Sequence, residues 1–272
     1  MAGDPILVLG ATGRIGRRLT RQLRDAGAEV RAASRQGEVP FDWTDPETWE
    51  PVVAGMARMW LMAPDGQPVD PAFVRLAVDQ GVQRIVLLSS AGIEEMGDER
   101  LLDAERTVRE SGAEWTILRP DWFAQNFDEG FFQPAVLAGE LAMPLGEQRM
   151  AFVDVEDIAA VAATALTEDG HAGRRYEPTG PRALSFQEAL DIIGTAAGRS
   201  IRYRGTDDAY REQQAALGFP AEQTEQEIAA FAALREAGDS KPNDVVRDLT
   251  GRQPKDFETF AEEAAARGAW TG

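Results

Sequence analysis

The fold of this chain is decided by the segment VLGATGRIG at residues 8–16, in which an apolar run leads into three glycines spaced three apart. Residues 6–9 are continuously apolar, as expected of a parallel strand that is buried on both faces. Apolar residues then recur at helical spacing, and Gly27 stands where a helix would end. The segment therefore predicts a tight turn between a buried strand and a helix.

This turn has the features of a nucleotide-binding turn. Gly10 permits the sharp bend, Gly13 lets the backbone approach a pyrophosphate, and Gly16 lets the helix pack closely on the sheet. The N–H groups and the positive dipole end of the helix would face the phosphates. The alternative is an ordinary strand-to-helix turn of another α/β protein. The glycine turn follows the first strand of a βαβ unit, however, and this position favours nucleotide binding.

Composition limits the kind of protein this can be. The 272 residues suffice for one large α/β domain with an appended lobe, and 43% of them are hydrophobic. The formal charge of −18, from 28 basic and 46 acidic residues, opposes binding to nucleic acid or to an anionic membrane. Without cysteine there is no disulfide framework and no thiolate zinc site, and we expect no metal.

No stretch of the sequence approaches the length of an apolar membrane span. The chain enters its first strand within a few residues, which leaves no room for a signal peptide. These observations predict a cytoplasmic protein that acts on a small molecule, without a membrane or nucleic-acid partner. Assembly into a homo-oligomer stays open.

Strands and helices alternate through the first half of the chain. Helix starts are marked by Asp-Pro pairs at residues 45–46 and 70–71, in which an N-cap residue precedes proline at the first helical position. The alternation predicts an α/β Rossmann fold with a doubly wound parallel sheet over residues 1–150, to which residues 151–178 return. The further strands are predicted at residues 29–33, 39–41, 59–62, 84–88 and 114–118.

Beyond the sixth strand the rhythm changes. Residues 123–132 are rich in phenylalanine and form either core or the wall of a pocket, whereas residues 139–148 are predicted as a loop. Asp154 can cap one helix, and Ser185 begins a capping box that opens another. Residues 179–272 are predicted as a smaller, mostly helical lobe on the substrate side.

The end of the second strand indicates which nicotinamide cofactor binds. A dinucleotide fold meets the adenosine ribose there, and in NAD-selective sites an acidic residue at this point bonds the ribose 2′-hydroxyl. This chain has Ser34 and Arg35 instead, and a basic residue accommodates a 2′-phosphate. Arg35, helped by Arg14, therefore favours NADP(H) over NAD(H), unless both arginines only decorate the surface.

A family resemblance rests on six segments. They are GATGRIGRRL at 10–19, RIVLLSSAG at 84–92, WTILRPDWFAQNF at 115–127, FVDVEDIA at 152–159, YEPTGPRALSFQEALDII at 176–193 and LTGRQPKDFETF at 249–260. Together they resemble the NmrA-like atypical short-chain dehydrogenases/reductases, which share the G-x-x-G-x-x-G spacing of the turn. The later segments are most similar to the branch with the ergot-alkaloid reductases, which reduce iminium or enal intermediates. The resemblance implies a Rossmann fold and a nicotinamide cofactor.

The resemblance also implies roles for individual residues. Arg35 would bind the 2′-phosphate, Asp42 the adenine amine, and Ala63 and Pro64 the ribose side. For Asp42, a loop residue that caps the next turn is an equally good interpretation. The implied cofactor site contains Gly10, Thr12, Gly13, Arg14, Ile15, Gly16, Arg35, Asp42, Ala63, Pro64 and Ser89.

Members of the wider superfamily carry a serine after the fifth strand and a Tyr-x-x-x-Lys pair on the next helix. If Glu105 matches the glutamate that commonly lies four residues after that lysine, Leu101 takes the lysine position and Gly97 the tyrosine position. No tyrosine elsewhere restores the motif. The fourth residues after Tyr176, Tyr203 and Tyr210 are Gly180, Asp207 and Gln214.

The missing pair restricts the chemistry. Reduction of a carbonyl group must neutralise a developing alkoxide, so the site needs a proton donor or a strong oxyanion partner. Reduction of an iminium ion quenches an existing positive charge and needs neither. Conjugated alkenes and quinones have an intermediate need for a proton donor, because the negative charge formed on hydride transfer can be delocalised or can take a proton from water. A shaped pocket beside the nicotinamide could then suffice.

Candidate active-site residues follow the fifth and sixth strands. Ser90 could donate to a substrate oxygen, or it could be a strand-end hydroxyl bonded to the backbone. Asp121 could bind a cationic substrate or donate a proton, or it could cap the next turn. Trp122, Phe123 and Asn126 would line the substrate pocket.

Two hypotheses follow. The first is an NADPH-dependent reductase of a small organic substrate of the iminium, enal or quinone type. The second is a regulator that senses NADP(H) without turnover, a class that the family also contains. Apolar walls suit an organic substrate, so the aromatic stretch favours the enzyme. The only histidine, His171, lies in a loop away from these motifs and is interpreted as solvated.

Overall fold

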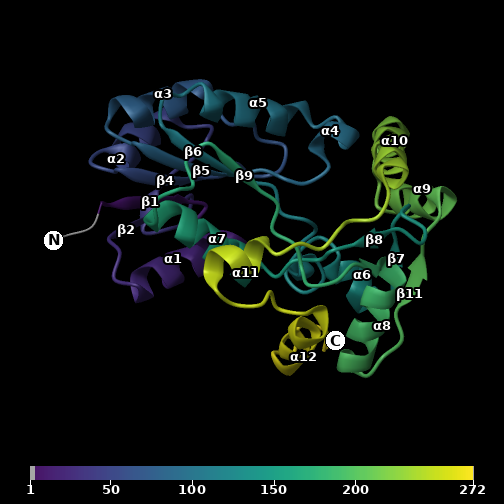
Figure 1. Ribbon diagram of the computed structural model, residues 1–272. Coiled ribbons are helices and arrows are strands. Elements are labelled where there is room, and N and C mark those ends of the chain that lie inside the picture. Colours follow the sequence, from purple (N-terminus) through teal and green to yellow (C-terminus); the bar gives the residue numbers. More distant parts are fainter. Residues whose placement is uncertain (1–3, 272) are drawn as a thin grey trace.

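The computed structural model describes residues 4–271, which form a central sheet with helices on both faces and a second lobe beside it (Figure 1). The strands of the central sheet are β1 (Ile6–Leu9), β2 (Val30–Ser34), β3 (Val39–Pro40), β4 (Arg58–Leu61), β5 (Arg84–Leu88), β6 (Glu114–Leu118) and β9 (Arg174–Tyr176). Their order is β3-β2-β1-β4-β5-β6-β9, and every neighbouring pair is parallel. This order confirms the doubly wound Rossmann fold that the sequence predicts.

Each face of the sheet has its own apolar core, because the central strands are buried on both sides. One face is covered by α2 (Trp49–Val53), which follows the 3-10 turn η1 (Pro46–Thr48), and by α3 (Pro71–Asp79) and α5 (Glu99–Arg109). The opposite face is covered by α1 (Arg14–Asp25), α7 (Val155–Thr167) and α11 (Val245–Thr250). The helices α1 and α7 pack directly against each other.

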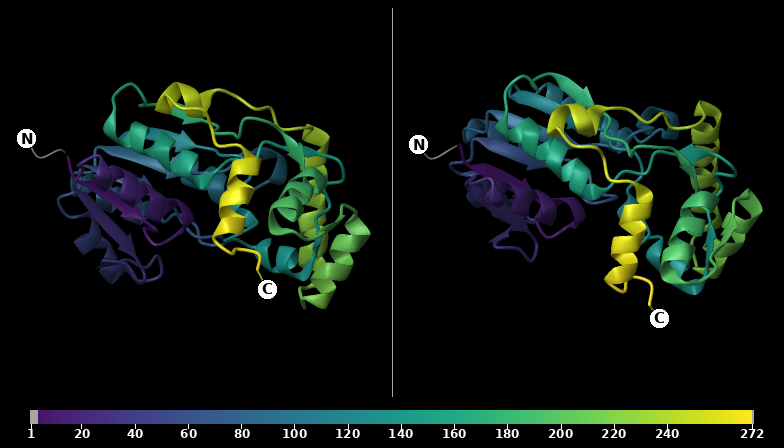
Figure 2. Two further views of the ribbon diagram at one scale, coloured as in Figure 1. Left: turned by 90° about the horizontal axis from the view of Figure 1, so that it is seen from below. Right: turned by 60° about the horizontal axis from the view of Figure 1, so that its bottom comes forward.

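The second lobe lies beyond the carboxyl ends of the strands and has a separate core that is rich in phenylalanine (Figure 2). Its helical elements are α4 (Ile93–Met96), η2 (Ala124–Asn126), α6 (Gln133–Ala138), α8 (Phe186–Ala197), α9 (Asp207–Ala216), α10 (Ala221–Ala237) and α12 (Phe257–Ala266). The element α4 belongs to the Rossmann half in sequence but contacts α10 of the lobe. Within residues 4–271, no helix combines the length and hydropathy that crossing a membrane requires.

The predicted helix starts are confirmed by their caps. Asp70 accepts a hydrogen bond from the backbone N–H of Ala72 at 2.7 Å, and Asp154 caps α7 in the same way through Glu156 at 2.7 Å. Ser185 forms the expected capping box at the start of α8. Local sequence therefore determines where these helices begin.

The prediction of a loop over residues 139–148 is wrong at its start. Residues Glu140–Ala142 form the strand β7, which pairs in parallel with β11 (Arg202–Arg204). A second small pair joins β8 (Arg149–Met150) to β10 (Leu184–Ser185). A three-residue strand has too few positions to show an alternating pattern, and its partner lies far along the chain, so no local signal marks it.

Candidate functional site

The glycine turn joins β1 to α1 and has the geometry that the sequence predicts. Gly10 adopts a φ of +64°, and a Cβ there would lie 2.5 Å from Sδ of Met62. The backbone N–H of Gly13 donates to the carbonyl of Gly10 at 2.8 Å and closes the turn. A Cβ on Gly16 would overlap this same carbonyl, so the helix can approach the turn only with glycine here.

Substitution of Gly16 should therefore affect folding rather than binding alone. We expect Gly16→Ala to lower the free energy of unfolding by about 3 kcal/mol, because the new methyl group meets backbone that cannot move aside. Gly13→Ala is the matched control, since its Cβ would contact only the carbonyl oxygen of Gly10, at 3.1 Å. Denaturant melts of the two variants measure the difference, and equal stability would contradict this view of the turn.

The N-terminus of α1 is uncapped and carries no acidic side chain. Its N-cap residue Gly13 provides no side-chain hydrogen bond, and the first turn of the helix contains no acidic residue. In contrast, α3, α7, α8 and α9 are all capped by a side chain. The side chain of Ile15 is buried against the sheet, so only its backbone faces the turn. Uncapped N–H groups at the positive end of a helix fit a pyrophosphate.

The residues expected at the adenosine ribose gather at the ends of β2 and β3. The hydroxyl of Thr12 donates to Oγ of Ser34 at 3.1 Å and so ties the turn to the end of β2. Arg35 is exposed, and within residues 4–271 its side chain makes no hydrogen bond or ion pair. An uncommitted guanidinium at this position can bind a 2′-phosphate.

Asp42 already has the role of a turn cap. Its Oδ1 accepts hydrogen bonds from the backbone N–H of Thr44 at 2.9 Å and from the Thr44 hydroxyl at 2.8 Å. These bonds hold the pKa of the Asp42 carboxyl below its usual value, and the positive charge of Arg35 acts in the same direction. Ala63 and Pro64 follow β4 at the same edge of the sheet, where Ala63 is half-buried and Pro64 is exposed. Asp42 can contact an adenine through its second oxygen only.

Ser89 belongs to a buried ionic network that the sequence analysis did not identify. Its hydroxyl donates to Glu105 at 2.7 Å, and Glu105, which is fully buried, also binds Arg119 through 2.6 and 2.8 Å hydrogen bonds. Burial raises the pKa of Glu105, but the bonds from Arg119 and Ser89 outweigh it and hold the pKa below its usual value. Arg119 also binds Glu94 on α4. The network thus fixes the ends of β5 and β6 and the start of α4.

Ser90 and Asp121 lie at the carboxyl edge and are bonded to backbone. The Ser90 hydroxyl donates to the carbonyl of Ala91 at 3.2 Å and is half-exposed. Asp121 is only 6% exposed, and its two oxygens accept from the N–H groups of Trp122 at 2.7 Å and Ala151 at 3.1 Å. Burial holds the pKa of Asp121 above its usual value, although hydrogen bonds from Ser240 and from these two N–H groups act against it. The contacts of Asp121 join two segments of the chain, while Ser90 keeps an accessible hydroxyl.

Arg14 connects the glycine turn to the predicted substrate pocket. Its Nη1 donates to Oδ1 of Asn126 at 2.6 Å, and its guanidinium lies 5.8 Å from the ring centre of Phe123. The structure therefore brings together three residues that the sequence analysis assigned to the cofactor site and the substrate pocket. Burial lowers the pKa of Arg14, and the carboxylates of Asp65 and Glu129 oppose this effect.

Aromatic side chains form a wall next to these residues. Trp122 stacks on Phe132 with ring centres 5.8 Å apart, and Phe131 lies 6.3 Å from Trp122 and 4.3 Å from Phe132. Phe131 is 60% exposed, an unusual state for an aromatic side chain in contact with a core. Phe231 of α10 adds to the wall at 6.4 Å from Trp122, and only the tertiary structure reveals this contribution.

The two positions matched to tyrosine and lysine hold no catalytic group. Gly97 ends α4 with a φ of +65°, and Leu101 lies in the first turns of α5. The hydroxyls of all three tyrosines have partners elsewhere, namely His171 for Tyr176, the carbonyl of Met143 for Tyr203, and Glu227 for Tyr210. His171, interpreted from the sequence as solvated, is partly exposed, and its Nδ1 lies 2.9 Å from the hydroxyl of Tyr176.

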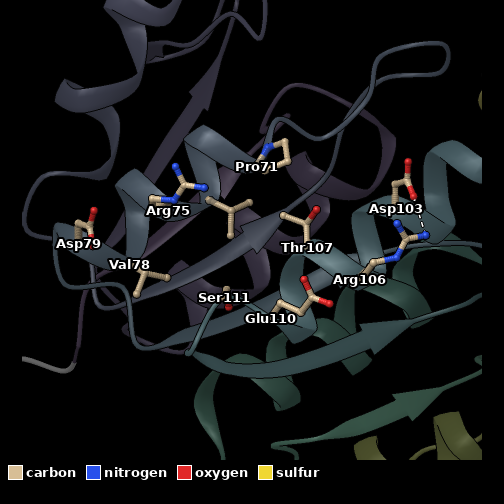
Figure 3. A pocket seen from close by; sticks show the side chains of 10 residues that line it. Pro71, Arg75, Val78, Asp79, Asp103, Arg106, Thr107, Glu110 and Ser111 are labelled. Atoms are coloured by element: carbon tan, nitrogen blue, oxygen red, sulfur yellow. Dashed lines mark ion pairs between the residues drawn. The ribbon is translucent and has the colours of Figure 1, made fainter.

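A groove of about 450 Å³ runs between α3 and α5 on the outer surface, and it shares no residue with the glycine turn (Figure 3). Its walls carry charges of both signs, including Arg75, Asp79 and the ion pair of Arg106 with Asp103. Among residues 4–271, no group of three or more histidine and acidic side chains could hold a metal ion. This groove is therefore separate from the carboxyl edge of the sheet, where the glycine turn lies.

Comparison with known sequences finds relatives over nearly the whole chain. The sequence model of a family described as NAD(P)H-binding matches residues 10–169. The Uncharacterized oxidoreductase YesF of Bacillus subtilis is 31% identical over 100% of this chain and 98% of its own length. NAD(P)H azoreductase of Xenophilus azovorans is 32% identical over 97% of this chain and 99% of its own. Agroclavine dehydrogenase of Claviceps fusiformis is 28% identical over 95% of this chain and 96% of its own length.

Solved structures share the fold across both lobes. The NADPH-dependent quinone oxidoreductase QOR2 of Escherichia coli superposes with a TM-score of 0.73 at 19% identity, covering 97% of this chain and 99% of that one. NmrA, a negative transcriptional regulator crystallised with NADP, superposes with a TM-score of 0.72 at 17% identity, and the match covers 99% of this chain and 97% of that one. One fold thus supports both a reductase and a regulator.

Proposed function

Since this chain belongs to the NAD(P)H-binding family, as an NAD(P)H-dependent oxidoreductase of the NmrA-like type, we propose that it reduces small organic molecules with NADPH. The substrates are iminium ions, enals or quinones rather than simple ketones. Relatives named as an azoreductase and an agroclavine dehydrogenase support an electron-poor, conjugated or cationic substrate. We place the reaction in the cytoplasm, because a protein without cysteine forms no disulfide and so needs no oxidising compartment.

Different residues of the chain would bind different parts of the cofactor. The uncapped N-terminus of α1 at Gly13 would bind the pyrophosphate, Arg35 the 2′-phosphate, and the edge residues Ala63 and Pro64 the ribose side. Arg14, which donates a hydrogen bond to Asn126, would add a charged contact to the pyrophosphate. NADPH bound in this way would supply a hydride, a reductant that no side chain of the protein can replace.

One observation carries the choice of substrate class, namely that the polar side chains Ser89, Ser90 and Asp121, which follow β5 and β6, already have protein partners. Ser89 donates to Glu105, and Asp121 is buried between two backbone N–H groups. Of these side chains, Ser90 is the most accessible, and its hydroxyl donates to the carbonyl of Ala91. Such an edge suits an acceptor whose reduction needs no strong proton donor.

The aromatic wall would hold the acceptor. The exposed face of Phe131, next to Trp122, offers stacking to a flat conjugated molecule and excludes water from one side of it. Purified protein should oxidise NADPH only when such an acceptor is added. NADPH binding without acceptor-dependent oxidation would contradict the proposed reductase and favour a regulator that senses NADP(H).

Arg35 should determine the choice between NADPH and NADH. A charge-assisted contact with the 2′-phosphate is worth about 1.5 to 3 kcal/mol, so Arg35→Ala should weaken NADPH roughly 10- to 150-fold and leave NADH nearly unchanged. Arg174→Ala, which removes an exposed arginine from β9 at the opposite edge of the sheet, is the matched control. Fluorescence titrations of both nucleotides measure this. Equal affinities in the wild-type protein would refute the preference.

A further inference from the structure

A short segment connects the glycine turn to the C-terminal part of the chain. We call residues 126–133 the buttress segment. On one side it binds α1, because Arg14 donates to Asn126 at 2.6 Å and Arg18 donates to Glu129 at 2.8 Å. Arg17 forms a further ion pair with Glu129. The position of Arg14 beside the turn therefore depends on this segment.

On its other side the buttress segment binds residues that follow α12. Arg267 donates to Oδ2 of Asp128 at 3.1 Å, and the indole N–H of Trp270 donates to the carbonyl of Phe127 at 2.8 Å. The side-chain amide of Gln133 donates to the carbonyl of Ala269 at 3.2 Å. These three bonds hold the segment between the C-terminal residues and α1.

Asp128 is the anomalous member of this segment. It is 5% exposed, and within residues 4–271 its Oδ1 is buried without any hydrogen-bond partner. A buried carboxylate oxygen without a partner costs stability, so a purely structural explanation is unsatisfactory. The charged groups that surround it are Arg14 and Arg18 of α1, Glu129 of its own segment, and Arg267 beyond α12.

We propose that Asp128 is a positioning residue that opposes dinucleotide binding when it is ionised, so that the protein takes up a proton at Asp128 when the cofactor binds. This inference rests on the proposed function only in that the glycine turn binds a dinucleotide. The ionised carboxylate attracts Arg14 toward the buttress segment and repels the phosphates that would compete for it. The neutral acid does neither, and Arg14 is then available to the pyrophosphate.

The environment of Asp128 makes this proton exchange accessible near neutral pH. Burial and the neighbouring charge of Glu129 raise the pKa of Asp128 to about 6, although Arg267 acts against the change. A phosphate bound beside Arg14 would raise the pKa of Asp128 further, because another negative charge disfavours the ionised form. Dinucleotide affinity should therefore fall as the pH rises through this range and Asp128 loses its proton.

The test is a titration of NADPH into wild-type protein and Asp128→Asn at about pH 5.5 and about pH 8. At the higher pH the variant should bind about three- to tenfold more tightly, the effect expected from removing one unit charge several ångströms away. At the lower pH the two proteins should converge. The 2′-phosphate of NADPH also titrates near pH 6, but it affects both proteins equally. Asp248→Asn, which changes an exposed carboxylate of α11, should leave the profile unchanged.

Two further measurements keep the proposal independent of one variant. Arg267→Gln retains the acid but removes the positive charge that lowers its pKa, so the pH at which affinity falls should move upward. Calorimetry of binding in two buffers with different heats of ionisation should show proton uptake by the wild type that Asp128→Asn reduces. Asp128→Asn should also melt at a higher temperature than the wild type at about pH 8, which verifies that it folds.

The outcomes separate this inference from the proposed function. If wild-type protein binds NADPH but Asp128→Asn shows the same pH profile and the same proton uptake, the role of Asp128 is refuted and the reductase proposal is unaffected. If wild-type protein binds no dinucleotide at either pH, the cofactor site itself is refuted, and the role of Asp128 with it.

Discussion

Gly13→Val should abolish NADPH binding, with a loss of affinity greater than about 100-fold, while the protein stays folded. The backbone of Gly13 has a φ of −76°, which valine tolerates, and its Cβ position is close only to the carbonyl oxygen of Gly10, at 3.1 Å. The two γ-methyl groups would nevertheless fill the space in front of the uncapped N–H groups of α1. A pyrophosphate that needs these N–H groups could not approach.

Circular dichroism melts and an NADPH titration on the same sample separate the two effects. Gly13→Ala should show a smaller loss, since it lacks the γ-methyl groups, and Gly16→Ala should lose stability rather than selective binding. A folded Gly13→Val protein that binds NADPH as the wild type does would exclude this turn as the phosphate site.

The parts of the fold that sequence predicts are those with a local cause. The turn at Gly10 requires a positive φ, and the caps Asp70 and Asp154 bond to N–H groups two residues away, so each signal lies within a few positions. The strand β7 has no such signal, because its partner β11 lies far along the chain. Sequence patterns therefore establish the Rossmann half in more detail than the second lobe.

The same distinction applies to the site. The sequence indicates Arg14, Phe123 and Asn126 separately, but only the structure shows that one guanidinium contacts the other two side chains. The network of Glu105 with Ser89 and Arg119 cannot be predicted from the sequence, since these residues meet from different elements. Burial of Asp128 is likewise invisible in the sequence, where aspartate usually indicates a solvated position.

The second large effect concerns the acceptor. A positioned general acid is typically worth roughly 100- to 10,000-fold in rate, and this site has a glycine and a leucine at the two positions matched to tyrosine and lysine. The loss of this rate enhancement should slow the reduction of simple ketones, because that reaction develops an alkoxide that must be protonated. It should spare iminium ions, because their reduction removes a charge. Quinones should be reduced as well, since the anion formed by hydride transfer spreads its negative charge over the ring and can take its proton from water.

The contribution of Ser90 can be isolated within the same experiment. Its hydroxyl is the accessible donor at the edge, so Ser90→Ala should slow quinone reduction modestly and leave iminium reduction unchanged. An effect of equal size on both acceptors would indicate that Ser90 positions the loop rather than contacts the substrate oxygen.

The most direct measurement is the rate of NADPH oxidation by the purified protein with three acceptors of matched size, namely a cyclic iminium ion, a quinone and an unactivated cyclic ketone. We expect turnover of the iminium ion or the quinone to exceed that of the ketone by roughly 100-fold or more, with the reduced products identified by mass spectrometry. Turnover of the ketone at a similar rate would contradict the account.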